Sequence, residues 1–155
     1  MLKIKIVAVG TLKEDYFRAA TNEYLKRIQK FSSINVKEVP EQSTSSAISI
    51  EKIKEIESKN VESELDGYVV LLDKGGKNLS SEEFAEFFDK KQTQGISKIT
   101  FAIGGSYGFS ESIKKKGDLI LSFGNITFPH QLMRVVLVEQ IYRAMTINNK
   151  VNYHK

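Results

Sequence analysis

The sequence predicts an α/β fold in which a mostly parallel sheet is sandwiched by helices. Short, continuously apolar segments such as Ile4–Val9 and Ile99–Ile103 are typical of strands buried on both faces, as in parallel sheets. Segments of helical periodicity separate them, and parallel strands need crossovers of about that length. With 155 residues, 41% hydrophobic and 27% charged, the chain fits one domain over residues 1–155.

The first two strands flank a long helix. Ile4–Val9 is the first expected strand, and Gly10 turns the chain into a helix of about twenty residues. Its buried face is marked at helical spacing by four apolar residues: Phe17, Tyr24, Ile28 and Phe31. Ile34–Val39 is the second expected strand, and Pro40 ends it because proline cannot donate to a sheet.

The next two strands are again separated by helices. A lysine- and glutamate-rich helix carries an apolar stripe of Ile50, Ile53 and Ile56. Tyr68–Leu72 is the third expected strand, and residues 73–78 form its exit loop. Ser80 and Glu83 fit a capping box, which opens a helix that turns Phe84, Phe87 and Phe88 inward and ends at Gly95.

The last third contains the fourth strand, Ile99–Ile103, a short helix capped by Ser110, and a fifth strand, Leu119–Leu121. Pro129 suits the first turn of a final helix from His130 to about Ile147. Its apolar face is expected to hold Leu132, Val136, Leu137 and Ile141, whereas Arg134, Glu139 and Arg143 lie on other faces. Glu139 and Arg143 are four residues apart, a spacing common in surface ion pairs, so a functional role for Arg143 and a simple pair are equally favoured.

Composition excludes several kinds of chemistry. The chain has no cysteine and two histidines, His130 and His154, so thiol chemistry is excluded and little material remains for a zinc site. We therefore expect no metal. No run of about 18 apolar residues exists, so we expect no membrane span, and the absence of cysteine suits a cytoplasmic protein.

The charge balance fits a polyanionic partner without requiring one. The net charge is +4 and the pI about 9.1, a balance that is compatible with a polyanion such as nucleic acid. Lys114, Lys115 and Lys116 form the only dense basic run. It is either a solvated helix end or a phosphate contact beside the neighbouring glycine segment.

Three strand exits are expected to meet in one crevice. Ligands of parallel α/β sheets bind beyond the carboxyl ends of the strands, and Leu72, Gly104 and Phe123 each stand at such an end. The segment Gly104–Gly108 permits close backbone approach to a ligand, although a tight strand–helix turn would use the same glycines. No Gly-Lys-Ser/Thr follows, so this is not a P-loop. Together with the apolar loop Phe123–Phe128, the exits can enclose a flat, uncharged ring.

Longer motifs resemble those of a known family. They are the segments 101–108, 121–123, 127–134 and 139–144, and the ending Tyr153-His154-Lys155; the opening residues 7–13 also fit. The chain resembles the ribosomal RNA large subunit methyltransferase H family, small members of the SPOUT class of knotted methyltransferases, over its whole length. The resemblance implies a C-terminal trefoil knot (the SPOUT α/β knot) within about residues 99–155.

The same resemblance implies the ligand and the assembly. S-adenosylmethionine is expected in the knot, and the family's cofactor contacts fall here on Leu72, Gly104, Phe123, Gly124, Asn125, Ile126, Thr127 and Phe128. A homodimer is expected, in which the tail of one protomer completes the site of the other. Where the family commonly has a glycine before this tail, the chain has Asn148, Asn149 and Lys150, and asparagine tolerates the positive φ that such a turn needs.

The implied reaction is methylation of N3 of a pseudouridine in helix 69 of 23S rRNA, on the assembled 70S ribosome. His154 is the titratable group best matched to take the N3 proton near neutral pH. Arg143 would stabilise charge on the uracil oxygens, and Lys155 would hold a phosphate. Tyr153, His130 and Lys155 are expected to contact the RNA. The alternative is a knotted ribosome-binding module without catalytic activity.

Overall fold

Five strands form a single sheet in the computed structural model, which describes all residues from Met1 to Lys155. The strand order is β2-β1-β4-β3-β5, and every neighbouring pair is parallel. This confirms the predicted α/β class with a parallel sheet. The strands are β1 Lys3–Val9, β2 Ser33–Val39, β3 Tyr68–Asn78, β4 Lys98–Ile103 and β5 Leu119–Ser122.

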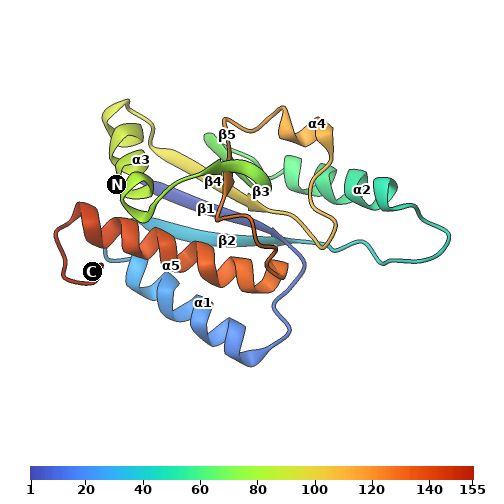
Figure 1. The fold of residues 1–155 in the computed structure, drawn as a ribbon, viewed down its shortest axis with the longest axis horizontal. Coiled ribbons are helices and arrows are strands. Elements are labelled where there is room, and N and C mark those ends of the chain that lie inside the picture. Colours follow the sequence, from blue (N-terminus) through green and yellow to red (C-terminus); the bar gives the residue numbers. More distant parts are fainter.

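Helices cover both faces of the sheet, so the domain has three layers. The helices α1 (Asp15–Ile28), α3 (Ser81–Thr93) and α5 (His130–Asn148) share one hydrophobic core with one face of the sheet, and α5 lies beside α1 in Figure 1. The helices α2 (Ile50–Glu62) and α4 (Glu111–Lys114) cover the other face. No helix combines the length and the apolar run needed to cross a lipid bilayer.

The first helix is shorter than expected. α1 has 14 residues and begins at Asp15, because Gly10 adopts a φ of +85° and the next residues form a loop before the helix. Ile28 is fully buried. Phe31 was wrongly assigned to the helix: the chain turns after Ile28, whose carbonyl oxygen accepts from the amides of Phe31 and Ser32.

The apolar stripe of α2 was also partly wrong. Ile53 is buried but Ile50 is 52% exposed, since it lies in the first turn, beyond the edge of the core. The buried stripe continues instead through Glu57, Ser58 and Val61, so two of its members are polar. In contrast, the capping box of Ser80 and Glu83 at the start of α3 is confirmed.

The third strand is longer than predicted. Residues 73–78 were expected to be an exit loop, but β3 runs to Asn78 and pairs with β5 on both sides of a register shift between Leu72 and Lys77. Gly76 permits this second pairing, because a Cβ there would lie 2.7 Å from the main chain of Ile120. Ser110 stands at the predicted N-cap of α4, yet its hydroxyl bonds Ser112 rather than a helix amide.

The buried face of α5 differs from the predicted one. Leu137 and Ile141 are buried as expected, but Leu132 and Val136 are only half-buried. Arg134 is 2% exposed: its Nη1 lies 2.5 Å from a carboxylate oxygen of Glu38, and its Nη2 donates to the carbonyl of Gly10. A buried arginine is tolerated here because it is paired.

Candidate functional site

A pocket of about 320 Å³ lies at the carboxyl edge of the sheet. It forms where β3, β4 and β5 end, and its wall contains Leu72, Gly104 and Phe123, the three strand exits that the sequence predicted to converge. The rest of the lining consists of Ile103, residues 105–108, Leu121, Ser122, Gly124, residues 126–128 and Met133, together with the polar residues Asp73, Lys74 and His130.

The glycine segment forms one wall by folding back on itself. The amide of Gly108 donates to the carbonyl of Gly105 at 3.0 Å. A Cβ on Gly104 would lie 3.2 Å from the carbonyl carbon of Gly108, closer than side chains ordinarily pack. Gly108 itself has a φ of +79°, which glycine adopts without strain. The glycines are therefore required both for the turn and for the open pocket.

The loop after β5 forms the opposite wall. Gly124 has a φ of +114°, and the hydroxyl of Ser122 donates to its carbonyl oxygen at 2.9 Å. Seven of the eight residues expected to contact a cofactor line the pocket; Asn125, which is exposed, does not. His130, expected to contact RNA, also lines this pocket and lies at the start of α5.

The basic run beside the pocket is mostly paired. Lys114 contacts Asp73 and Glu111, and Lys116 pairs with Glu62. Lys115 forms no ion pair and is exposed. The structure thus favours the solvated helix end over a phosphate site made by all three lysines.

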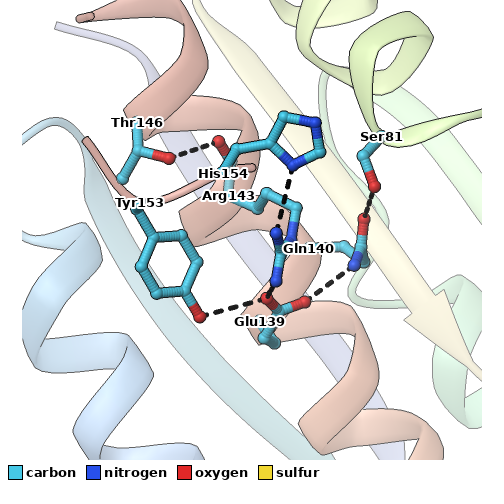
Figure 2. A network of polar contacts seen from close by, with 7 residues as sticks. All are labelled: Ser81, Glu139, Gln140, Arg143, Thr146, Tyr153 and His154. Carbon is cyan, nitrogen blue, oxygen red and sulfur yellow. Dashed lines mark hydrogen bonds and ion pairs between the residues drawn. The ribbon is translucent and has the colours of Figure 1, made fainter. Parts of the chain in front are cut away.

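A second cluster gathers at the other end of α5, and Figure 2 shows its contacts. Glu139 is its centre: one carboxylate oxygen accepts from Arg143 Nε at 2.9 Å and Nη2 at 2.5 Å, and from the Tyr153 hydroxyl at 3.2 Å. The expected ion pair of Glu139 and Arg143 is confirmed, and it is partly buried. Lys155 is exposed at the terminus.

His154 bridges an arginine and a carboxylate. Its Nδ1 lies 3.1 Å from Arg143 Nη1, and its Nε2 lies 2.8 Å from Glu82 at the start of α3. A guanidinium only donates, so Nδ1 accepts; an ionised carboxylate only accepts, so Nε2 carries the hydrogen. In this arrangement neither ring nitrogen has a free lone pair for a substrate proton.

The cluster shifts the ionisation of its members. The hydrogen bonds with Glu139 raise the pKa of Arg143, although burial opposes this. Burial is the largest cause that raises the pKa of Tyr153, and hydrogen bonding with Tyr24 adds to it. The hydrogen bond with His154 lowers the pKa of Glu82. At neutral pH the cluster therefore holds a charged arginine and a neutral tyrosine.

The pocket and the tail cluster lie at opposite ends of α5. Arg143 follows His130 by thirteen residues of the same helix, which corresponds to roughly 20 Å at the rise of an α-helix. Figure 1 shows α5 running from the loop after β5 to the C-terminal tail at its far end. The structure thus brings the predicted cofactor residues together and the predicted tail residues together, but it does not join the two sets within one chain.

Sequence reasoning missed several residues near these sites. Lys74, Tyr107 and Met133 line the pocket, and Glu82 contacts His154 from a helix distant in sequence. No local pattern marks these positions. Glu57 is different, because it interrupts the apolar series Ile53, Glu57, Val61 at helical spacing. A carboxylate at a core position was a signal available in the sequence.

Comparisons with known proteins identify the family. The family model described as "Predicted SPOUT methyltransferase" matches residues 2–154. The chain is 47% identical to the ribosomal RNA large subunit methyltransferase H of Lactobacillus helveticus, over 99% of this chain and 100% of that protein. It is 44% identical to the protein of the same name from Streptococcus agalactiae, with the same coverage of both chains.

Solved structures share the fold at low identity. A probable methylase family protein from Haemophilus influenzae has a TM-score of 0.55 at 13% identity, covering 98% of this chain and 70% of the other. The tRNA (m1G37) methyltransferase from Aquifex aeolicus has a TM-score of 0.54 at 14% identity, covering 92% and 69%. The chain therefore belongs to the SPOUT methyltransferase family, and within it to the ribosomal RNA large subunit methyltransferase H group.

Proposed function

We propose that the protein is an S-adenosylmethionine-dependent methyltransferase of ribosomal RNA. The relatives that match the whole chain are named as methyltransferases of large-subunit ribosomal RNA, and this is the observation that carries the proposal. More finely, the substrate is N3 of a pseudouridine in helix 69 of 23S rRNA within the 70S ribosome, in the cytoplasm. The net charge of +4 suits a partner made of phosphates.

The pocket fits the cofactor in size and in chemistry. Its volume of about 320 Å³ falls within the range of small-molecule sites. Gly104 has no side chain, and this leaves room beside Gly108 that a Cβ would occupy. We assign the cofactor to Leu72, Gly104 and the loop Phe123–Phe128, whose main-chain groups can hydrogen-bond the edge of an adenine. When bound, S-adenosylmethionine supplies a methyl group that is already electrophilic, so the reaction needs no metal.

The complete site requires two copies of the chain. Since roughly 20 Å of helix separates Arg143 from His130, the tail of one protomer completes the pocket of the other in a two-fold homodimer. Exposed apolar side chains support this assembly: Tyr107 and Ile126, 42% and 68% exposed, lie at the pocket, and Val151, 44% exposed, lies in the tail. The trefoil knot expected within residues 99–155 stays a prediction.

The tail residues provide the chemistry of proton removal. Arg143 turns toward the uracil oxygens as negative charge develops there, and this releases Nδ1 of His154, the ring nitrogen that it occupies in the resting structure. The freed lone pair accepts the N3 proton. Tyr153 and His130 contact the base, and Lys155 holds a neighbouring phosphate. Positioning the nitrogen about 3–3.5 Å from the methyl group accounts for much of the remaining acceleration.

The proposal is tested by methyl transfer from labelled S-adenosylmethionine to intact 70S ribosomes, followed by mapping of the labelled nucleotide. Label on a helix 69 pseudouridine is expected, and ribosomes that lack these pseudouridines are the control and should remain unlabelled. Label elsewhere in rRNA would support the rRNA methyltransferase activity but show that the methylated nucleotide is a different one. Cofactor binding without any transfer would favour a ribosome-binding module without catalytic activity.

A further inference from the structure

Glu57 is a buried carboxylate that the proposed reaction does not use. It lies on α2, on the opposite side of the sheet from α5, and only 3% of its surface is exposed. One of its carboxylate oxygens, Oε2, accepts from the amide of Gln42 at 2.9 Å. The other, Oε1, is buried and has no hydrogen-bond partner. A buried, incompletely paired carboxylate lowers stability, so packing alone does not explain its presence.

The unpaired oxygen lies directly against the pocket wall. A Cβ placed on Gly105 would lie 2.6 Å from Glu57 Oε1, and Gly105 lines the pocket. The φ of Gly105 is not in the left-handed region, so its backbone would accept other residues. A methyl group at this position would therefore require either the buried carboxylate or the pocket segment to shift.

The next residue of α2 holds the other end of the same segment. The hydroxyl of Ser58, also 3% exposed, accepts from the amide of Ser110 at 3.0 Å. Ser58 thus bonds one end of the segment, residues 105–110, and the preceding residue of the same helix, Glu57, lies behind its other end. Phe109, 2% exposed, anchors the middle of the segment in the same core.

We propose that Glu57 is a positioning residue for the cofactor: its carboxylate sets the depth of the pocket by packing against the main chain of Gly105. This inference rests on the proposed assignment of the pocket to S-adenosylmethionine. Glu57 does not line the pocket and does not touch reacting atoms. Its loss should therefore weaken cofactor binding while leaving turnover at saturating cofactor nearly unchanged.

The test is a double-mutant cycle on the affinity for S-adenosylmethionine, measured by calorimetry on the full-length protein. Gly105→Ala should raise Kd by about tenfold or more, equivalent to about 1.4 kcal/mol, because the new methyl displaces the segment. Glu57→Ala should raise Kd similarly. The double variant should bind no more weakly than Glu57→Ala alone, since the new methyl group then occupies the space that the carboxylate vacated.

A matched control uses Glu55, which lies on the exposed side of the same helix and pairs with Lys59. Glu55→Ala should leave Kd unchanged, and Gly105→Ala should raise Kd by the same factor whether or not Glu55→Ala is also present. Two results would overturn the inference. One is a Kd for Glu57→Ala equal to that of the wild type. The other is that Gly105→Ala raises Kd by the same factor in the Glu57→Ala background as in the wild type. If the wild type itself fails to bind S-adenosylmethionine, the cofactor assignment fails instead.

A second variant separates an effect on cofactor binding from an effect on folding. Glu57→Gln keeps the shape of the side chain and the acceptor for Gln42 but places amide hydrogens against Gly105. We expect a melting temperature at neutral pH that is no lower than that of the wild type, a KM for S-adenosylmethionine raised about threefold or more, and a kcat within about twofold. An unchanged KM together with a lowered kcat would contradict a positioning role.

Discussion

Nδ1 of His154 accepts a hydrogen bond from Nη1 of Arg143 at 3.1 Å, so the proposed base is held by the residue proposed to stabilise charge. Glu82 occupies the second ring nitrogen. The two contacts place the ring hydrogen of His154 on Nε2 and leave no free lone pair on Nδ1. In the proposed mechanism, movement of Arg143 toward the substrate frees this lone pair, so substrate binding and activation of the base are linked in one contact.

Replacing His154 tests its role as the base. His154→Gln retains a donor that can reach Glu82 but cannot take a proton near neutral pH, so single-turnover methylation of 70S ribosomes should slow by about 10²- to 10⁴-fold. The affinity for S-adenosylmethionine should change little, because His154 is assigned to the substrate proton whereas the cofactor is assigned to residues of the pocket itself. An unchanged rate would show that His154 is not the base. The control is Lys30→Gln, a substitution at an exposed position, which should leave the rate unchanged.

The end of α5 offers a stabilising substitution. Lys150 has a φ of +56°, and the amides of Lys150 and Val151 donate to the carbonyls of Ile147 and Thr146, the pattern of a Schellman cap. Lys150→Gly should raise the free energy of unfolding by about 1 kcal/mol, because glycine adopts this conformation without strain. Denaturant unfolding measures the change; a loss of stability would contradict the assigned turn.

That turn shows where sequence reasoning was insufficient. The sequence lacks the family's glycine before the tail and predicts a positive φ at an asparagine, yet Asn149 has a φ of −101° and Lys150 adopts the positive φ. Helix length decides which residue follows the cap, and element ends are the least certain part of a prediction. The five strands were found because burial on both faces leaves a continuous apolar run.

Arg134 should be more important to stability than a typical arginine. Arg134→Met leaves the half-exposed carboxylate of Glu38 and the carbonyl of Gly10 without their partner, and we expect a loss of about 2 kcal/mol in the free energy of unfolding. Chemical denaturation measures it. Arg18→Met removes an exposed pair with Asp15 and should cost less than about 1 kcal/mol. Equal losses for the two variants would contradict the special role of Arg134.

The ionisation of Glu57 predicts how stability depends on pH. Burial is the main cause that raises its pKa above 4.5; the repulsion by Glu41 adds to it, and the amide of Gln42 opposes it. The folded state therefore binds this proton more tightly than the unfolded state, and stability falls as pH rises from 4.5 through the raised pKa. Glu57→Gln lacks this titration, so its melting temperature relative to the wild type should increase across that window and then level off. If this difference in melting temperature instead decreased with pH, the folded state would stabilise the charged form of Glu57, which would contradict a raised pKa.

The candidate site was predictable in its parts but not in its assembly. Strand exits at Leu72, Gly104 and Phe123 were placed correctly because parallel topology brings carboxyl ends to one edge. The contacts of Glu82 with His154 and of Glu57 with Gly105 join segments distant in sequence, and no periodic pattern encodes them. The separation of pocket and tail, in contrast, follows from the length predicted for the last helix, which the structure confirms (Figure 1).

Subunit mixing tests the composite site most directly. Arg143→Ala disables the tail, and Gly104→Val closes the pocket because even its Cβ would crowd Gly108; each variant alone should be inactive. Mixed after subunit exchange, half of the dimers are hybrids, and each hybrid has one intact site if tail and pocket come from different chains. About a quarter of the wild-type methylation of 70S ribosomes is then expected. Hybrid dimers that are detected by mass but show no activity would contradict a site shared between two chains.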